Sequence, residues 1–165
     1  MQPKPNAQIW LLLSALVIAL DQLTKHIALA LLQPLQPREV IPGFLNWTLA
    51  FNTGAAFSFL HDAGGWQRWM FSALAIAVCG VLVVWLRRLP RADWRTALPL
   101  ALVIGGALGN LVDRLRFGHV TDFIEVYHRQ WSWPAFNVAD SAISVGAVLL
   151  ILFGLGGRKA PGDAP

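Results

Sequence analysis

Four long apolar stretches constrain this chain more than any other feature. They cover approximately residues 9–32, 69–86, 97–112 and 139–155. A helix needs about 20 predominantly apolar residues to cross a bilayer, so the connections leave no room for a large soluble domain. Charged residues make up 13% of the chain, against about 25% in soluble domains. The sequence therefore predicts an all-α integral-membrane protein, with four transmembrane helices in a single domain over residues 1–165.

The ends of the second and third stretches support a compact bundle. Trp66 and Trp69 precede the second stretch, and Arg87 and Arg88 follow it. Aromatic and basic residues of this kind gather at membrane interfaces. The third stretch contains the spacing Gly105-x-x-x-Gly109, which allows helices to approach closely in lipid.

The first stretch also imitates a cleavable secretory signal, because an apolar run at 9–20 is followed by Ala28-Leu29-Ala30. However, Asp21, Lys25 and His26 lie between the run and that supposed cleavage site, which favours a retained span. Asp21 and Lys25 are spaced i,i+4 with the acid first, the better-paired order on a helix. Whether they form only a structural ion pair stays open at this point.

Basic residues predict the orientation in the membrane. The short segment 87–95 contains four arginines, and Arg158 and Lys159 follow the last stretch. Short segments rich in Lys and Arg are cytoplasmic, so both termini are expected inside and the connections at about 33–66 and 113–138 outside. Within 33–66, Val40–Gly43 and Trp47–Phe51 are β-prone and separated by turn formers. We expect them to form a small extracytoplasmic cradle at the membrane surface.

Other classes of function find no support in the sequence. The formal net charge is +4, but the basic residues flank apolar runs and do not form a stripe with interleaved aromatics, so no nucleic acid is expected. Cys79 is the only cysteine, which excludes an intrachain disulfide and predicts a packing role. The four histidines show no metal-ligand spacing: His26, His61, His119 and His128. No metal or cofactor is predicted.

Polar residues gather where the third stretch ends and the fourth begins. Asn110, Asp113 and Arg114 are spaced i, i+3, i+4 and share a helix face. The same spacing recurs at Asn137, Asp140 and Ser141. With Asp122 in the loop between them, these two faces predict a water-accessible cavity at the outer surface.

Asp122 and Asp140 are the candidate chemical groups, and two interpretations fit them. Ionisable residues at membrane depth are functional candidates by default. If the carboxylates converge, they can share a proton and perform aspartyl proteolysis. Alternatively, Asp122 pairs locally and Asp140 is an N-terminal helix charge stabilised by the macrodipole. Spacing alone does not choose between them.

Five ordered motifs resemble those of one family. They are Asp21-Gln22-x-Thr24-Lys25, Asn52-Thr53-Gly54-Ala55-Ala56-Phe57-Ser58, Gly105-Gly106-Ala107-x-Gly109-Asn110-x-x-Asp113-Arg114, Gly118-x-Val120-x-Asp122-Phe123 and Phe136-Asn137-x-Ala139-Asp140-Ser141. In order and spacing they resemble bacterial lipoprotein signal peptidase (signal peptidase II). The resemblance extends from about residue 9 to 155.

The resemblance implies a four-span aspartyl endopeptidase. Such an enzyme removes the signal peptide from diacylglyceryl-modified prolipoproteins, cutting before the lipidated cysteine. It implies that Asp122 and Asp140 are catalytic, and that four residues bind substrate: Asn52, Asn110, Arg114 and Asn137. Asp21, Lys25 and Asp113 would be structural or positioning residues. The segment 128–133 matches no motif and receives no role.

The resemblance also implies a setting for the protein. We expect a multi-pass protein of the bacterial inner membrane, in contact with membrane lipid and monomeric. A proton-coupled transporter or channel is the alternative from another class, since buried acids and an arginine can line an ion path. It would more often show internal repeats or broken helices, and neither is evident in the sequence. A purely structural bundle is the third interpretation.

Overall fold

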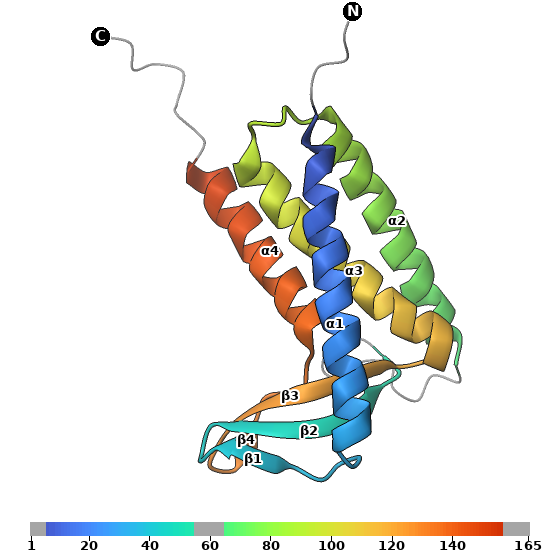
Figure 1. Cartoon of the computed structure of the whole chain (residues 1–165), viewed down its shortest axis with the longest axis vertical. Helices are drawn as coiled ribbons and strands as arrows, with labels where there is room; N and C mark the ends of the chain where they lie inside the picture. The colour runs from blue at the N-terminus through green and yellow to red at the C-terminus, as the bar shows by residue number, and fades with distance from the viewer. Residues whose placement is uncertain (1–5, 55–64, 157–165) are drawn as a thin grey trace, which may run out of the picture.

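A computed structural model describes residues 6–54 and 65–156 of the chain. Long helices stand side by side, and a small sheet lies across one end of them (Figure 1). In chain order the elements are η1 (Ala7–Trp10), α1 (Leu11–Leu31), β1 (Arg38–Ile41), β2 (Leu45–Asn52), α2 (Trp66–Arg88), α3 (Trp94–Phe117), β3 (Val120–His128), β4 (Trp131–Ser132) and α4 (Val138–Gly156). Predictions for the basic tail and for residues 55–58 of the second motif lie outside the described residues.

The helices agree with the predicted apolar stretches to within a few residues. Among the described residues, three helices are long and apolar enough to cross a membrane: Ala7–Leu31, Trp66–Arg88 and Trp94–Phe117. The apolar part of α4, Val138–Gly154, is shorter. The fold is thus mostly helical, with three candidate spans, a shorter fourth helix and a small sheet.

Helix α3 lies at the centre of the bundle and contacts the other three helices. Its glycines allow this, because they sit where neighbouring backbones come closest. A Cβ on Gly105 would lie 2.9 Å from the carbonyl oxygen of Ser14 on α1, and one on Gly106 would lie 2.3 Å from that of Ala139 on α4. The small-residue packing predicted for the third stretch is therefore confirmed.

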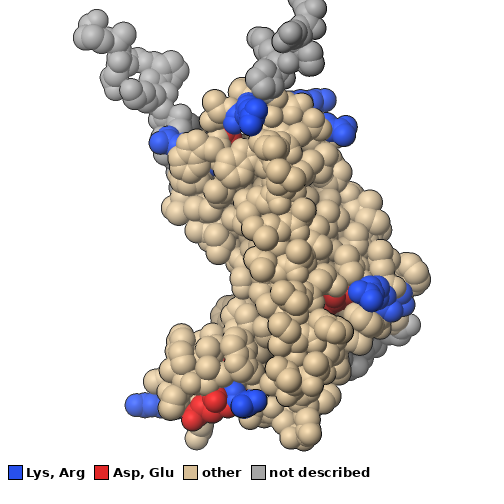
Figure 2. Space-filling view, viewed as in Figure 1, with Lys and Arg blue, Asp and Glu red and all other residues tan. Residues whose placement is uncertain are grey.

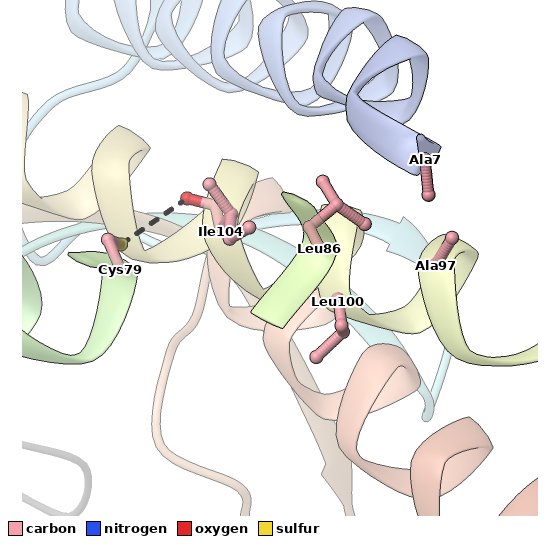
Figure 3. Packing of buried hydrophobic residues seen from close by; sticks show 6 residues of the cluster. All are labelled: Ala7, Cys79, Leu86, Ala97, Leu100 and Ile104. Atoms are coloured by element: carbon pink, nitrogen blue, oxygen red, sulfur yellow. Dashed lines mark hydrogen bonds between the residues drawn. The ribbon is translucent and has the colours of Figure 1, made fainter. Parts of the chain in front are cut away.

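The apolar core lies near the end of the bundle opposite the sheet. Figure 3 shows Cys79 of α2 next to Ile104 of α3, and Ala7 of η1 on the side of Ala97, with Leu86 between them. Cys79 is buried, and its Sγ lies 3.9 Å from the carbonyl oxygen of Ile104. The predicted packing role of this cysteine is confirmed.

The sheet is antiparallel throughout, with the strand order β1-β2-β3-β4. The two β-prone stretches of 33–66 correspond to β1 and β2, as predicted. The sequence did not predict β3 or β4, and Asp122, which was expected in a loop, lies in β3. Pairing of β2 with β3 places Ala50 opposite Asp122. The sheet therefore fixes the backbone that carries this aspartate.

Charged side chains lie mainly towards the two ends of the molecule, with a broad uncharged belt between them on the face shown (Figure 2). One end carries the basic α2–α3 connection and the described ends of the chain, and the other carries the sheet. An uncharged belt between polar ends is the surface expected of a bundle that crosses a bilayer.

Candidate active site

Asp122 of β3 and Asp140 in the first turn of α4 line the same cleft. The cleft has a volume of about 770 Å³. It lies between the sheet and α4, where the outline of the molecule is hollowed in Figure 2. Asp122 is only 3% exposed, and Asp140 is partly buried. The fold therefore brings the two carboxylates to one cleft from two different elements, although residues 123–139 separate them in the chain.

Asn137 connects the two aspartates. Its Nδ2 donates to Asp122 Oδ1 at 2.7 Å, and its Oδ1 accepts from the Asp140 backbone N–H at 2.8 Å. In return, Asp140 Oδ2 accepts from the Asn137 backbone N–H at 3.3 Å. This reciprocal pair at the start of α4 is a capping box. The end of the helix thus fixes the position of Asp140.

The protonation of Asp122 is shifted by its surroundings. Burial, followed by the nearby Asp140 carboxylate, raises the pKa of Asp122 to about 7, although hydrogen bonds from Asn137 and Asn52 act in the opposite direction. An acid with a pKa near neutrality can give or take a proton at physiological pH. Perturbed groups of this kind in clefts are candidates for catalysis.

Behind the cleft, Lys25 of α1 is buried in a polar cluster. Its Nζ lies 2.8 Å from Asp21 Oδ2, 3.1 Å from Asp113 Oδ2 and 2.9 Å from Asn110 Oδ1. These three contacts use the three donors of the ammonium group. The predicted Asp21–Lys25 ion pair is present, and it extends to Asp113 on α3. Asn110 links this cluster to the site, because its Nδ2 donates to Asp140 Oδ1 at 2.7 Å.

Asp21 and Asp113 each hold a backbone segment of the site. Asp21 Oδ1 accepts from the Ala139 N–H in the first turn of α4 at 2.9 Å. Asp113 Oδ2 accepts from the Thr121 N–H, next to Asp122, at 2.9 Å. Gln22, to which the sequence patterns assigned no role, donates to Asp113 Oδ1 at 2.9 Å. The buried cluster therefore fixes both chain segments that carry the aspartates.

Arg114 and apolar side chains complete the cleft. Arg114 Nη2 donates to the Gly54 carbonyl at 3.2 Å, and its guanidinium lies 5.3 Å from the centre of the Phe71 ring. Its Nε is buried without a hydrogen-bond partner among the described residues. The apolar part of the lining is provided by Phe51, Val120, Trp133, Phe136, Ile143 and Val145. A cleft of this composition suits a partly apolar chain that also presents carbonyl groups.

The structure brings the predicted site residues into two layers. Five line the cleft: Asn52, Asn110, Arg114, Asp122 and Asp140. Asn137 was predicted to contact substrate, but it is fully buried and lies beneath the aspartates. Asp21, Lys25 and Asp113 form the layer behind. The sequence patterns missed Trp133, which lines the cleft although its segment matches no motif. Within the described ranges, no three His, Cys, Asp or Glu residues are arranged as metal ligands.

Comparisons with known proteins agree on one family. The family model described as "Signal peptidase (SPase) II" matches residues 13–155. A lipoprotein signal peptidase of Xanthomonas campestris pv. campestris (strain 8004) is 58% identical over 154 residues, which are 93% of this chain and 92% of that protein. One of Xylella fastidiosa (strain M12) is 58% identical over 152 residues, covering 90% of this chain and 91% of that protein.

A solved structure described as "Bacterial membrane enzyme structure by the in meso method at 2.3 A resolution" is also similar. It is 30% identical, with a TM-score of 0.81, and the match covers 100% of this chain and 99% of that one.

Proposed function

Because the chain belongs to the signal peptidase II family, we propose that this cleft cleaves the signal peptide from prolipoproteins, with Asp122 and Asp140 as an aspartic-type catalytic pair. One observation carries the assignment of the pair. Two carboxylates from different elements face one cleft and are joined through a single buried amide, Asn137. If Asp140 were only a charge at the helix N-terminus, this would explain its hydrogen bonds with Asn137. It would not explain why Asp140 lines the same cleft as Asp122.

The surroundings of the two aspartates suggest which one carries the proton. Asp122 is the more buried, and its pKa of about 7 leaves a large fraction of it protonated at neutral pH. Asp140 accepts hydrogen bonds from Asn110 Nδ2 and the Asn137 N–H at the start of a helix, and such donors stabilise a carboxylate. Asp122 is therefore the acid and Asp140 the base.

The reaction follows from these roles. Asp140 takes a proton from a water molecule while the oxygen of that water attacks the scissile carbonyl carbon. At the same time, Asp122 donates its proton to the carbonyl oxygen. The tetrahedral intermediate then collapses. Asp140 returns a proton to the leaving nitrogen while Asp122 recovers one from the hydroxyl, the C–N bond breaks, and a carboxylic acid and an amine are formed. No cofactor takes part in this proposal.

Substrate contacts are assigned to residues that line the cleft. Asn52, Asn110 and Arg114 surround the pair and offer amide or guanidinium groups to peptide carbonyls. Most of these donors already bind within the protein, so a substrate carbonyl would compete with the Gly54 carbonyl for Arg114. The apolar walls, including Trp133 and Val145, suit the acyl groups of a diacylglyceryl-modified cysteine. Cleavage before that cysteine would leave the lipid on the new N-terminus of the product.

The membrane arrangement is part of the proposal. We infer that α4 is a fourth span, that both termini are cytoplasmic, and that the sheet and the cleft face the extracytoplasmic side of the inner membrane. The arginine-rich segment between α2 and α3 supports this orientation. The protein is proposed to act as a monomer and as a single domain over residues 1–165, because all the proposed site residues come from one chain.

The proposal is tested by incubating purified protein in lipid with a diacylglyceryl-modified precursor and with its unlipidated twin. We expect the lipidated precursor to be cut far faster, because buried acyl chains contribute about 0.8 kcal/mol per CH₂ to membrane anchoring and hold the scissile bond at the carboxylates. Activity should persist in EDTA. Equal rates on the two precursors would overturn this mechanism. A loss of activity in EDTA that zinc restores would overturn it as well. An absence of any cleavage would favour the transporter alternative.

A further inference from the structure

A second groove lies between the last turns of α1 and the β1–β2 part of the sheet. Its volume is about 550 Å³, and it shares no lining residue with the cleft. Most of the lining is apolar, including Ile27, Leu31, Val40, Trp47 and Phe123. Phe123 follows Asp122 directly in β3, so this strand contributes consecutive residues to the two hollows. The proposed peptidase mechanism does not use this groove.

The groove lies at the membrane boundary. Helix α1 is a candidate span, and the sheet lies beside its C-terminal end (Figure 1). Ile27 is 46% and Leu31 70% exposed, and they lie one turn apart on the same helix face. Exposed leucine and isoleucine on a spanning helix face lipid. The groove therefore continues the lipid-facing surface of α1 up to the sheet.

An unpaired cation lines the same groove. Arg38 and Trp47 lie opposite each other in the β1–β2 ladder, and both contribute to the lining. Arg38 is exposed and has no ion pair in the part of the chain that the structure describes. Glu39 also lines the groove, but its carboxylate accepts a hydrogen bond from the Tyr127 hydroxyl and forms no ion pair with Arg38 among the described residues. A guanidinium with no carboxylate partner beside an apolar groove complements an anionic group on an apolar tail.

We propose that this groove binds a glycerophospholipid of the bilayer. One acyl chain lies along Ile27 and Leu31 of α1, and the phosphate binds Arg38. Trp47 provides the aromatic side chain typical of the interface between lipid tails and headgroups. Because the bound lipid packs on Phe123, it supports β3 next to the residue that carries the catalytic proton in the proposed mechanism. Binding itself does not depend on that mechanism.

The proposal is tested by native mass spectrometry of delipidated full-length protein in detergent, titrated with dioleoyl-phosphatidylglycerol. The variants are Arg38→Gln, Arg38→Lys and, as a matched control in the turn between β3 and β4, Arg129→Gln. We expect Arg38→Gln to weaken phospholipid binding about five-fold, the effect of one basic residue at an anionic surface. Arg38→Lys and Arg129→Gln should bind as the unmodified protein does.

Two further ligands separate the parts of the lipid. Dioleoylglycerol has the chains without the phosphate, and glycerol 3-phosphate has the phosphate without the chains. Each should bind at least about five-fold more weakly than the phospholipid. Equal binding to Arg38→Gln and Arg129→Gln, or equal binding of dioleoylglycerol and phospholipid, would overturn the proposal. The readout is bound mass, so it is independent of whether the protein cleaves prolipoproteins.

Discussion

Asn137 and Asp140 hydrogen-bond each other twice, side chain to backbone in both directions, at the start of α4. The residue proposed as the base is therefore also part of the cap of its own helix. This double use positions the carboxylate of Asp140, because turning it away would leave the backbone N–H of Asn137 without this partner. The Asn137 amide then extends the link to Asp122 at 2.7 Å.

Replacing either aspartate by asparagine should abolish cleavage. Asp122→Asn and Asp140→Asn each keep the side-chain volume but remove one half of the acid–base pair, so we expect turnover to fall by roughly 10²–10⁴-fold. Protein abundance should stay near normal. The matched control is Glu125→Gln, the same chemical change in β3 outside the cleft, which should retain activity. Substantial turnover by either aspartate variant at normal abundance would remove the pair from the mechanism.

The pH profile should have an alkaline limb near pH 7. The proposed acid is active when protonated, and the pKa of Asp122 is about 7, so kcat/KM falls as pH rises through that value. Asn52 hydrogen-bonds Asp122 and lowers its pKa. Asn52→Ala should therefore raise the pKa and move the limb to higher pH. Asn46→Ala serves as the control, because Asn46 binds Glu125 in the same sheet. A limb that stays in place in Asn52→Ala would contradict the role of Asp122.

Removing the buried cation should cost stability. Lys25→Met leaves Asp21 and Asp113 buried without their ammonium partner, and breaking buried pairs in this way costs about 3–5 kcal/mol. Thermal unfolding in detergent should show a large decrease in Tm. The exposed Arg116→Met, which also removes one positive charge, should change stability by less than about 0.5 kcal/mol.

A double variant isolates the cause of that loss. Lys25→Met with Asp113→Asn removes one of the two uncompensated charges and should recover part of the Tm. Equal unfolding temperatures for Lys25→Met and Arg116→Met would show that the cluster does not stabilise the fold.

Close packing between α3 and α4 gives a further prediction. Gly106→Ala would place a Cβ 2.3 Å from the Ala139 carbonyl oxygen, and α4 must move to relieve the clash. Overpacking of this kind costs about 1–3 kcal/mol, and because Asp140 follows Ala139, turnover should fall as well. Gly80→Ala on α2 is the control, since a Cβ there meets nothing within 4 Å. Unchanged Tm and turnover in Gly106→Ala would contradict this close approach of the two helices.

Topology can be measured with reporter fusions. A fusion after Arg91, between α2 and α3, should report the cytoplasm, and a fusion after Arg129, between β3 and β4, should report the outer side. The reason is the arginine density of the α2–α3 connection. A cytoplasmic signal at Arg129 would place the cleft on the wrong face for a substrate that has crossed the membrane.

The helices and part of the site were predictable from local sequence. The rest of the sheet and of the site depends on contacts between residues that are far apart in the chain. Apolar stretches of membrane length define the helices, and the i,i+4 spacing of Asp21 and Lys25 predicts their pairing. The strand β3 was missed because alternation fails within it. Phe123 and Ile124 are consecutive apolar residues, and both donate backbone N–H groups to the Phe136 carbonyl.

The buried layer behind the cleft also could not be predicted from local sequence. Spacing does not show that Lys25 reaches Asp113 on another helix, because residues so far apart in the chain meet only through packing. The same holds for Asn137. Its motif suggests a contact with substrate, but pairing of β3 with the turn before α4 leaves it no exposed surface.

The hydrogen bond from the Ala139 backbone to Asp21 joins the first long helix of the chain to the last. During synthesis, α1 leaves the ribosome long before α4 is translated. Until then, Asp21 lacks the hydrogen bond from the Ala139 backbone N–H. Both aspartates of the site are also made late, in β3 and α4. The site therefore cannot assemble before translation is almost complete, and a nascent chain arrested before α4 leaves the Asp21 carboxylate in the membrane without its Ala139 donor.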